Sequence, residues 1–181
     1  MSNFAFLQAE WPAVHEAAVK AEAAVYADPR TACFYARRTL ELAVAWAYKS
    51  DESLHLPYQT NLSALLHDPT FKKAAGEAVF LKTQVITRHG NQAVHSHRAI
   101  QESDALTAVR ELFHVGYWLA CLGAGGGAAG GAFGGKGGGA GGLRGAREGT
   151  SRSGIRSAAE RAERPRCARC GTNMPRPEKR A

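Results

Sequence analysis

Three of the seven histidines in the chain stand close to an arginine, in the stretch from Arg88 to His97. Arginine stabilises anionic groups such as phosphates, and histidine gains and loses protons near neutral pH. The residue types and their spacing predict that Arg88 holds a phosphate and that His95 acts as a general acid or base. His89 or Asn91 would position the substrate, and His97 is a further candidate binding residue. This stretch is therefore the candidate for a site that binds or cleaves a phosphodiester.

The same stretch also has an interpretation that involves no ligand. Arg88 and His89 are cations of the kind that favour the negative end of a helix, and Gly90 is the residue that most readily adopts the left-handed conformation after it. Ala93 and Val94 would then hold the following turn against the core. The sequence leaves both interpretations open.

Arg37 and Arg38 form a second group of candidate binding residues. Each has the spacing of an ion pair with Glu41 on one helix. They predict either a solvated helix edge or the border of a groove beneath His95, and both alternatives stay open.

Composition divides the chain near residue 121. Residues 1–121 carry 11 Lys and Arg against 12 Asp and Glu, whereas residues 122–181 carry 12 basic and 4 acidic residues and 17 of the 20 glycines. The formal net charge of +7 belongs to the second part and does not by itself indicate nucleic-acid binding. We expect residues 1–121 to fold as one domain. Residues 122–181 are expected to form a Gly/Ala/Arg-rich disordered tail, because they bury too little apolar surface to offset the entropy of ordering.

Apolar residues recur at helical spacing through the first part, and sustained period-two alternation is absent. Asn61 and Asp68 are typical N-cap residues, and Pro69 suits a first helical position. The fold class is therefore all-α, an antiparallel bundle of about five helices. The expected helices span residues 10–26, 31–49, 62–66, 69–90 and 103–120.

The aromatic residues and Cys33 are expected in the core of this bundle. Trp11, Trp46 and Trp118 are predicted to be core aromatics and not base-stacking platforms. The residues expected to line the inner sides of the second and last helices are Phe34, Leu40, Val44, Ala47, Leu106, Val109, Phe113, Tyr117 and Ala120.

Other motifs in the chain predict no cofactor and no metal site. Gly130–Lys136 spells G-x-x-x-x-G-K, but it lacks the following Ser or Thr and has no strand before it. Cys167 and Cys170 supply two of the four ligands that zinc requires. The sequence shows no signal segment and no apolar run of 18 residues, so we expect a cytoplasmic protein without a membrane anchor.

The pair formed by Arg88 and His95 resembles the Arg-x6-His signature of HEPN domains. These domains are helical bundles, often dimeric, and some are metal-independent ribonucleases. The resemblance implies a homodimer that cleaves RNA with Arg88 and His95.

A closer resemblance covers residues 1 to about 121. The stretches 2–7, 21–22, 37–41 and 90–95 are similar to the N-terminus of the R (HsdR) subunit of type I restriction enzymes. In that family a HEPN-like helical domain of unknown function precedes a nuclease and a helicase-like DNA translocase. The resemblance implies an accessory or assembly module whose partners are other restriction–modification subunits. ATP and magnesium would belong to domains that this chain lacks.

The resemblance stops abruptly after Ala120. A change to Gly, Ala and Arg is what a shifted reading frame through GC-rich DNA produces, so we expect a truncated or frameshifted R subunit. The alternative is a stand-alone interaction domain with a genuine basic tail that contacts nucleic-acid phosphates.

Overall fold

The computed structural model describes residues 2–126, and the side chains of residues 2–123. A 3-10 turn, η1, precedes five helices, and no strand occurs within this range. The all-α prediction is therefore confirmed, and the predictions for residues 127–181 lie outside the described residues. The elements are η1 (Ala5–Leu7), α1 (Pro12–Ala24), α2 (Pro29–Ser50), α3 (Leu62–His67), α4 (Pro69–His95) and α5 (Glu102–Gly126).

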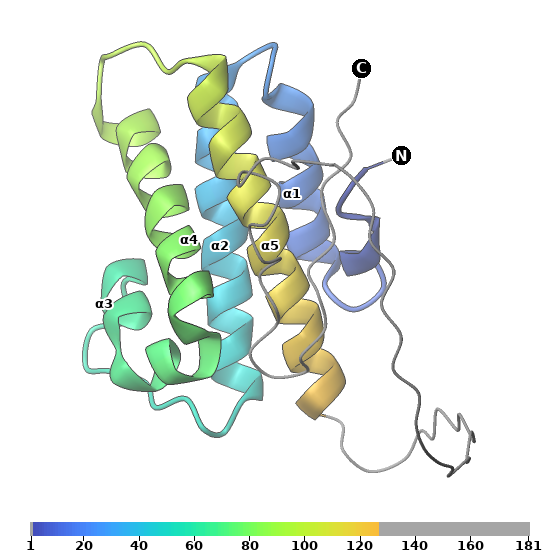
Figure 1. Ribbon diagram of the computed structural model, residues 1–181, viewed down its shortest axis with the longest axis vertical. Helices are drawn as coiled ribbons and strands as arrows, with labels where there is room; N and C mark the ends of the chain where they lie inside the picture. The colour runs from blue at the N-terminus through green and yellow to red at the C-terminus, as the bar shows by residue number, and fades with distance from the viewer. Residues whose placement is uncertain (1, 127–181) are drawn as a thin grey trace, which may run out of the picture.

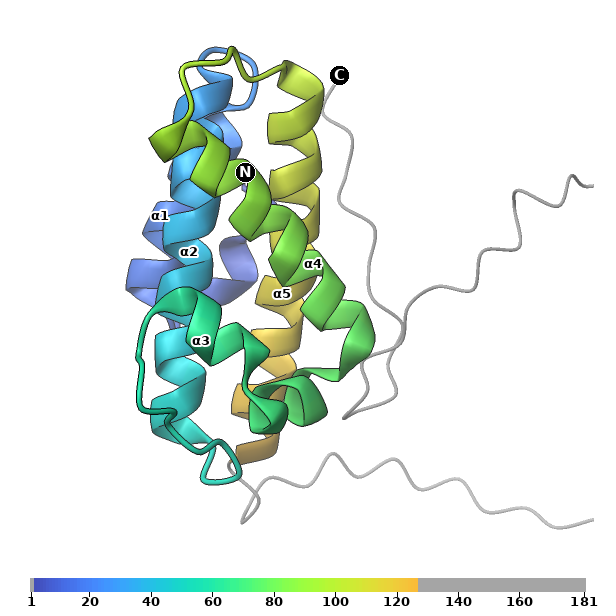
Figure 2. The same cartoon turned by 90° about the vertical axis from the view of Figure 1, so that its left-hand side faces the viewer.

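Helix α2 is the centre of the bundle. It packs against α1, α4 and α5, and α4 also packs against α5 (Figure 1). The pairs α1–α2, α2–α4 and α4–α5 run antiparallel, whereas α2 and α5 run in the same direction. The short helix α3 lies against the first part of α4 and against α2 (Figure 2). No helix within residues 2–126 combines the length and the apolar character needed to cross a bilayer.

Side-chain caps start three of the helices, and two of them, Asn61 and Asp68, were predicted. The side chain of Asp28 accepts a hydrogen bond from the Thr31 backbone N–H and starts α2. Asn61 caps α3 in the same way, and Asp68 caps α4 ahead of Pro69. Each cap satisfies a backbone donor that has no partner inside its helix.

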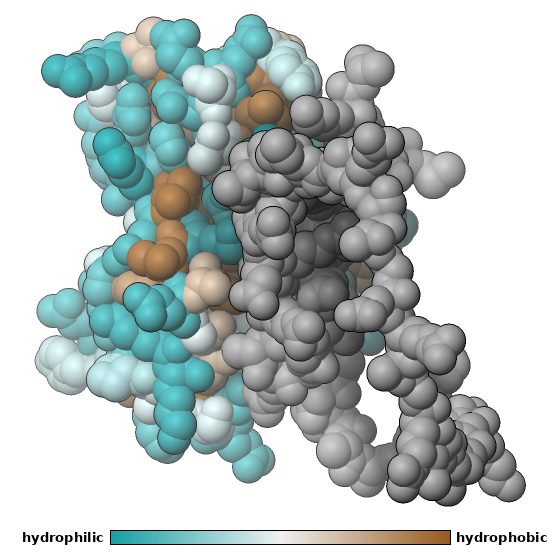
Figure 3. All heavy atoms as spheres, viewed as in Figure 1, coloured by the Kyte–Doolittle hydropathy of each residue, from teal (hydrophilic) through white to brown (hydrophobic). Residues whose placement is uncertain are grey.

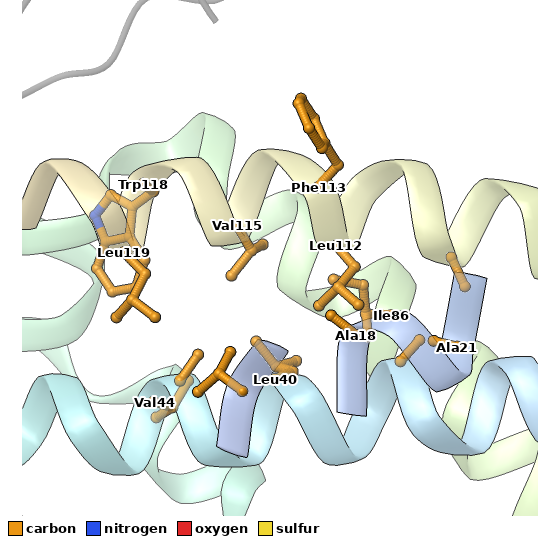
Figure 4. Close-up of a cluster of buried hydrophobic side chains, with 14 of the residues drawn as sticks. Ala18, Ala21, Leu40, Val44, Ile86, Leu112, Phe113, Val115, Trp118 and Leu119 are labelled. Carbon is orange, nitrogen blue, oxygen red and sulfur yellow. The ribbon is translucent and has the colours of Figure 1, made fainter. Parts of the chain in front are cut away.

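Small and large apolar residues alternate in the core, which lets the helices approach closely. Alanines on α1 and α2, including Ala18 and Ala36, are fully buried beside leucine and valine side chains. Each fully buried Leu or Val stabilises the fold by about 1.5–3 kcal/mol. The side chains that meet between α2 and α5 are Leu40, Val44, Leu112, Val115 and Leu119 (Figure 4).

The prediction of a core position is wrong for two residues, Phe34 and Leu106. Phe34 is 46% exposed and Leu106 is 39% exposed. Each stands six residues before a buried leucine, Leu40 or Leu112, and six residues at 3.6 per turn place it about 120° away around the helix. The tryptophan prediction is confirmed, since Trp11 and Trp118 are buried and Trp46 packs against the core.

A kink in α4 was not predicted. Gly76 has φ 76° and ψ 160°, a conformation that interrupts the helix between Pro69 and His95. Residues with a Cβ very rarely adopt these angles. Glycine at this position therefore allows the first turns of α4 to turn toward α3 (Figure 2).

Candidate functional site

Helix α4 does not end at Gly90 as the sequence predicted. It continues to His95, and Gly90 has no left-handed conformation. A Cβ on Gly90 would lie 2.4 Å from the Cβ of Arg37 on α2. Gly90 therefore allows α2 and α4 to approach closely. Because α4 continues to His95, Arg88 and His95 belong to one helix.

Arg37 and Arg38 pair with Glu41 on their own helix. The Nε atom of Arg37 lies 3.3 Å from Oε1 of Glu41, and Nη1 of Arg38 lies 3.5 Å from Oε2. The stem of Arg37 covers Gly90, so this arginine contributes packing as well as charge. The ion-pair prediction is confirmed, and a binding role for these two arginines stays a prediction.

Three of the candidate residues share the exposed face of α4. Seven residues make almost two helical turns, so Arg88 and His95 lie on the same side, about 10 Å apart along the axis, with Asn91 between them. All three side chains are exposed, and none of these side chains forms a hydrogen bond or ion pair with another described residue. This face can therefore offer a cation, an amide and an imidazole to a ligand.

His89 is separated from that face. It lies on the side of α4 that carries Lys82, seven residues earlier, and Lys82 contacts Glu111 of α5. The Nδ1 atom of His89 is buried and has no hydrogen-bond partner within residues 2–126. Asn91 is thus the residue placed to assist Arg88 and His95.

The end of α4 is held by an arginine that sequence reasoning missed. Nη1 of Arg30 donates hydrogen bonds to the carbonyl oxygens of Ala93 (2.6 Å) and Ser96 (2.8 Å), and Nη2 donates to that of Arg98 (2.7 Å). The last carbonyls of a helix lack partners within it and carry partial negative charge. Arg30 therefore caps α4 from the first turn of α2. A cation in a first turn is opposed by the positive helix end, which was the available signal for an outside partner.

The candidate binding residue His97 lies in the segment that Arg30 fixes. His97 and Arg98 follow the end of α4 and are both exposed. Because the carbonyls of Ser96 and Arg98 are bound by Arg30, the backbone on both sides of His97 is held beside His95.

A second polar arrangement joins the N-terminus to α1. Ser2 Oγ donates to Oε2 of Glu22 (2.5 Å), and Nδ2 of Asn3 donates to Oε1 (2.6 Å). The Asn3 backbone N–H also points to both carboxylate oxygens. Phe4 and Leu7, which follow, are buried in the core. We call this group, Ser2, Asn3 and Glu22, the N-terminal latch.

A charged cluster connects α4 with α5. Lys82 Nζ lies 2.5 Å from Oε2 of Glu111, and His114 Nδ1 lies 3.5 Å from the same oxygen. The neighbouring His114 and Lys82 side chains outweigh burial and lower the pKa of Glu111 to about 2. All three side chains are at most 20% exposed, so the cluster belongs to the helix interface and not to the exposed face of α4.

The described part of the chain contains no set of side chains placed to bind a metal ion. No group of three or more His, Cys, Asp or Glu side chains in residues 2–126 is placed to hold a metal ion. The chemistry available at the exposed face of α4 is therefore charge stabilisation by Arg88 and proton transfer by His95.

The comparison with family models gives one match. A family described as "Domain of unknown function (DUF4145)" matches residues 19–115, more than half of the chain. The match runs from α1 to α5 and includes Glu22, Arg30 and the stretch from Arg88 to His97. Neither a curated protein nor a solved structure matches the chain.

Proposed function

We propose that the bundle of this chain, which belongs to the family described as "Domain of unknown function (DUF4145)", is an accessory and assembly module without catalysis of its own. The module is that of the N-terminus of a type I restriction R subunit, which takes part in DNA restriction. Its partners are other restriction–modification subunits. Support comes from the resemblance of residues 1–121 to that family and from the contacts that the resembling stretches make.

One observation carries the proposal: the resembling stretches meet each other inside the molecule. The opening stretch, 2–7, is hydrogen-bonded to Glu22 of stretch 21–22. Arg37 of stretch 37–41 lies against Gly90 of stretch 90–95. These contacts are packing and hydrogen bonding, which maintain the fold. The resembling stretches therefore include residues that hold the bundle together, as the assembly module requires.

An assembly module needs a surface for its partner, and the helices offer exposed apolar side chains. Leu81 and Val94 on α4 are 51% and 48% exposed, and Phe34 on α2 is 46% exposed. Figure 3 shows hydrophobic surface over α4 and the adjacent helix, surrounded by hydrophilic surface. Leu81 lies on the side of α4 that carries Arg88, whereas Val94 lies on a different side of the helix, so Leu81 is the apolar side chain that we test as a partner contact.

The test uses surface plasmon resonance with the full chain immobilised and the purified methyltransferase–specificity complex of the same organism in solution. We expect the wild type to bind and Leu81→Glu to weaken binding at least about tenfold, because a buried unpaired charge costs more than 1.4 kcal/mol. Tyr26→Glu is the matched control, since Tyr26 is 63% exposed and follows α1. No binding by the wild type, or equal loss in both variants, would contradict the proposal.

The proposal also makes a prediction about the gene. If the chain is a frameshifted R subunit, another reading frame of the DNA after codon 120 should encode the nuclease and the ATP- and magnesium-dependent translocase. If no frame continues in this way, the R-subunit assignment is wrong and the basic tail belongs to a stand-alone protein.

A second candidate function is a HEPN-type, metal-independent ribonuclease that uses Arg88 and His95. The observation that favours it is that both side chains are exposed on one face of α4. Within the described residues, neither side chain forms a hydrogen bond or ion pair. Single-stranded RNA incubated with the protein and EDTA should then be cleaved, and cleavage should be lost in His95→Ala and Arg88→Ala. His55→Ala, which removes another exposed histidine, should retain cleavage. Absence of cleavage by the wild type would exclude this function.

A further inference from the structure

Cationic side chains gather where a helix end is negative. The C-terminus of a helix carries about half a negative charge on its unpaired carbonyls. Around the end of α4, at His95, the exposed side chains include Arg88, His97 and Arg98. An anion that approached them would also meet the negative helix end, so the bare helix terminus would work against binding.

Arg30 changes the charge of that helix end. Its guanidinium donates to three carbonyl oxygens, those of Ala93, Ser96 and Arg98, at 2.6 to 2.8 Å. Guanidinium supplies several donors in a rigid plane, which suits three acceptors in fixed positions. A full positive charge placed against about half a negative charge leaves the end of α4 net positive.

Within the described residues the carboxylate that offsets part of this charge is that of Asp28, two residues before Arg30. Asp28 accepts hydrogen bonds from the backbone and hydroxyl of Thr31. These bonds and, to a smaller extent, the charge of Arg30 lower the pKa of Asp28, whereas the hydrogen bonds of the guanidinium itself go to the carbonyls. The arginine therefore serves the carbonyls of the α4 end and the segment that follows it. It fixes the backbone that presents His97 and Arg98, and it removes the repulsion of an anion by the helix end.

We propose that Arg30 is the positioning residue of an anion-binding surface formed by Arg88, His95, His97 and Arg98, which takes the phosphates of single-stranded RNA. The proposal rests on the second candidate function, because that function assigns a phosphodiester ligand to Arg88 and His95. It goes further by naming the residue that prepares the surface and does not contact the ligand.

The experiment is an NMR titration of the full chain with a 12-nucleotide oligouridylate, which follows the backbone amides of residues 95–98. These local signals report binding at the α4 end separately from any binding elsewhere in the chain. Arg30→Gln should weaken the binding seen at these amides by about five- to tenfold, the scale of a charge at a helix end. Arg30→Lys should recover only part of the affinity, because it restores the charge but not the planar set of donors that holds the three carbonyls.

Lys49→Gln is the matched control. It removes the same formal charge from the opposite end of α2, where the Lys49 side chain is exposed. It should change the affinity less than twofold. Equal loss in Arg30→Gln and Lys49→Gln, or unchanged binding in Arg30→Gln, would overturn the role of Arg30. If the wild type gives no shifts at residues 95–98, the phosphodiester ligand is wrong, and the second candidate function fails together with this inference.

Discussion

Polar side chains are hydrogen-bonded to each other in the N-terminal latch, whereas those on the exposed face of α4 form no such bonds within the described residues. In the latch, Ser2 and Asn3 are hydrogen-bonded to both oxygens of Glu22. On α4, Arg88 and His95 have no partner within the described residues. The latch residues and His95 lie in stretches that resemble the R-subunit N-terminus, whereas Arg88 lies just before one of them. The difference teaches that resemblance alone does not separate residues that hold the fold from residues available to a ligand.

The stretch from Arg88 to His97 contains both kinds of residue. Gly90 and Ala93 are buried toward α2, whereas Arg88 and His95 are exposed on the opposite side. A helix divides its residues between two faces in this way because it repeats every 3.6 residues. Substitutions on the two faces should therefore have different effects, and the following predictions are ordered from the largest effect to the smallest.

Gly90→Ala should cause the largest loss of stability. Its new Cβ would meet the Cβ of Arg37 at 2.4 Å, and that atom can move only with the backbone of α2. We expect the free energy of unfolding to fall by about 3 kcal/mol. Urea denaturation measures it, with Gly116→Ala as the control, because there the nearest atom is the flexible end of Leu7 at 3.3 Å. Equal stability of the two variants would disprove the close approach of α2 and α4.

Glu22→Ala should destabilise the protein by about 2 kcal/mol, because it removes the charged acceptor of the latch and leaves its donors unsatisfied. The control is Glu16→Ala, which breaks an exposed pair with Lys20 and should destabilise the protein less than Glu22→Ala does, because solvent screens exposed ion pairs. Thermal unfolding compares the two variants. If the latch did not stabilise the fold, Glu22→Ala and Glu16→Ala would unfold at the same temperature.

Acid should weaken the contact between α4 and α5. The pKa of Glu111 is lowered to about 2 in the folded protein, so its contribution is present above the ordinary pKa of about 4.3. It is lost as the pH falls from there toward 2, and we expect it to be about 2 kcal/mol. Stability measured from pH 7 to pH 2 should fall less steeply in Glu111→Gln than in the wild type. Glu77→Gln, at an exposed position, should keep the wild-type slope, and parallel curves for all three proteins would contradict the prediction.

Arg88→Ala and His95→Ala should have the smallest effect on stability, within about 0.5 kcal/mol of the wild type. Both side chains are exposed and make no contact that the fold needs. Urea denaturation of each variant checks this. If either variant lowered the free energy of unfolding by more than about 1 kcal/mol, that side chain would be shown to stabilise the fold.

The sequence was sufficient for the elements that depend on local signals. Asn61, Asp68 and Pro69 act within a few residues of the helix starts that they predicted. Helical spacing likewise predicted that Leu40 and Val44 of α2 line the core, and both are fully buried.

The sequence was insufficient where distant segments decide. Gly90 follows two cations and looks like a helix end, but its reason is the approach of α2, which no local pattern reveals. The partners of Arg30 lie more than 60 residues away. The separation of His89 from Arg88 also depends on α4 continuing past Gly90, so the candidate site could be predicted only as a set of residues and not as a surface.

The central claim is that the bundle is an assembly module, and sedimentation velocity tests it most directly. The full chain would be mixed at micromolar concentration with the methyltransferase–specificity complex of the same organism. The account predicts one faster boundary that contains both, and the same boundary with the Arg88→Ala/His95→Ala double variant. Two independent boundaries with the wild-type chain would contradict it.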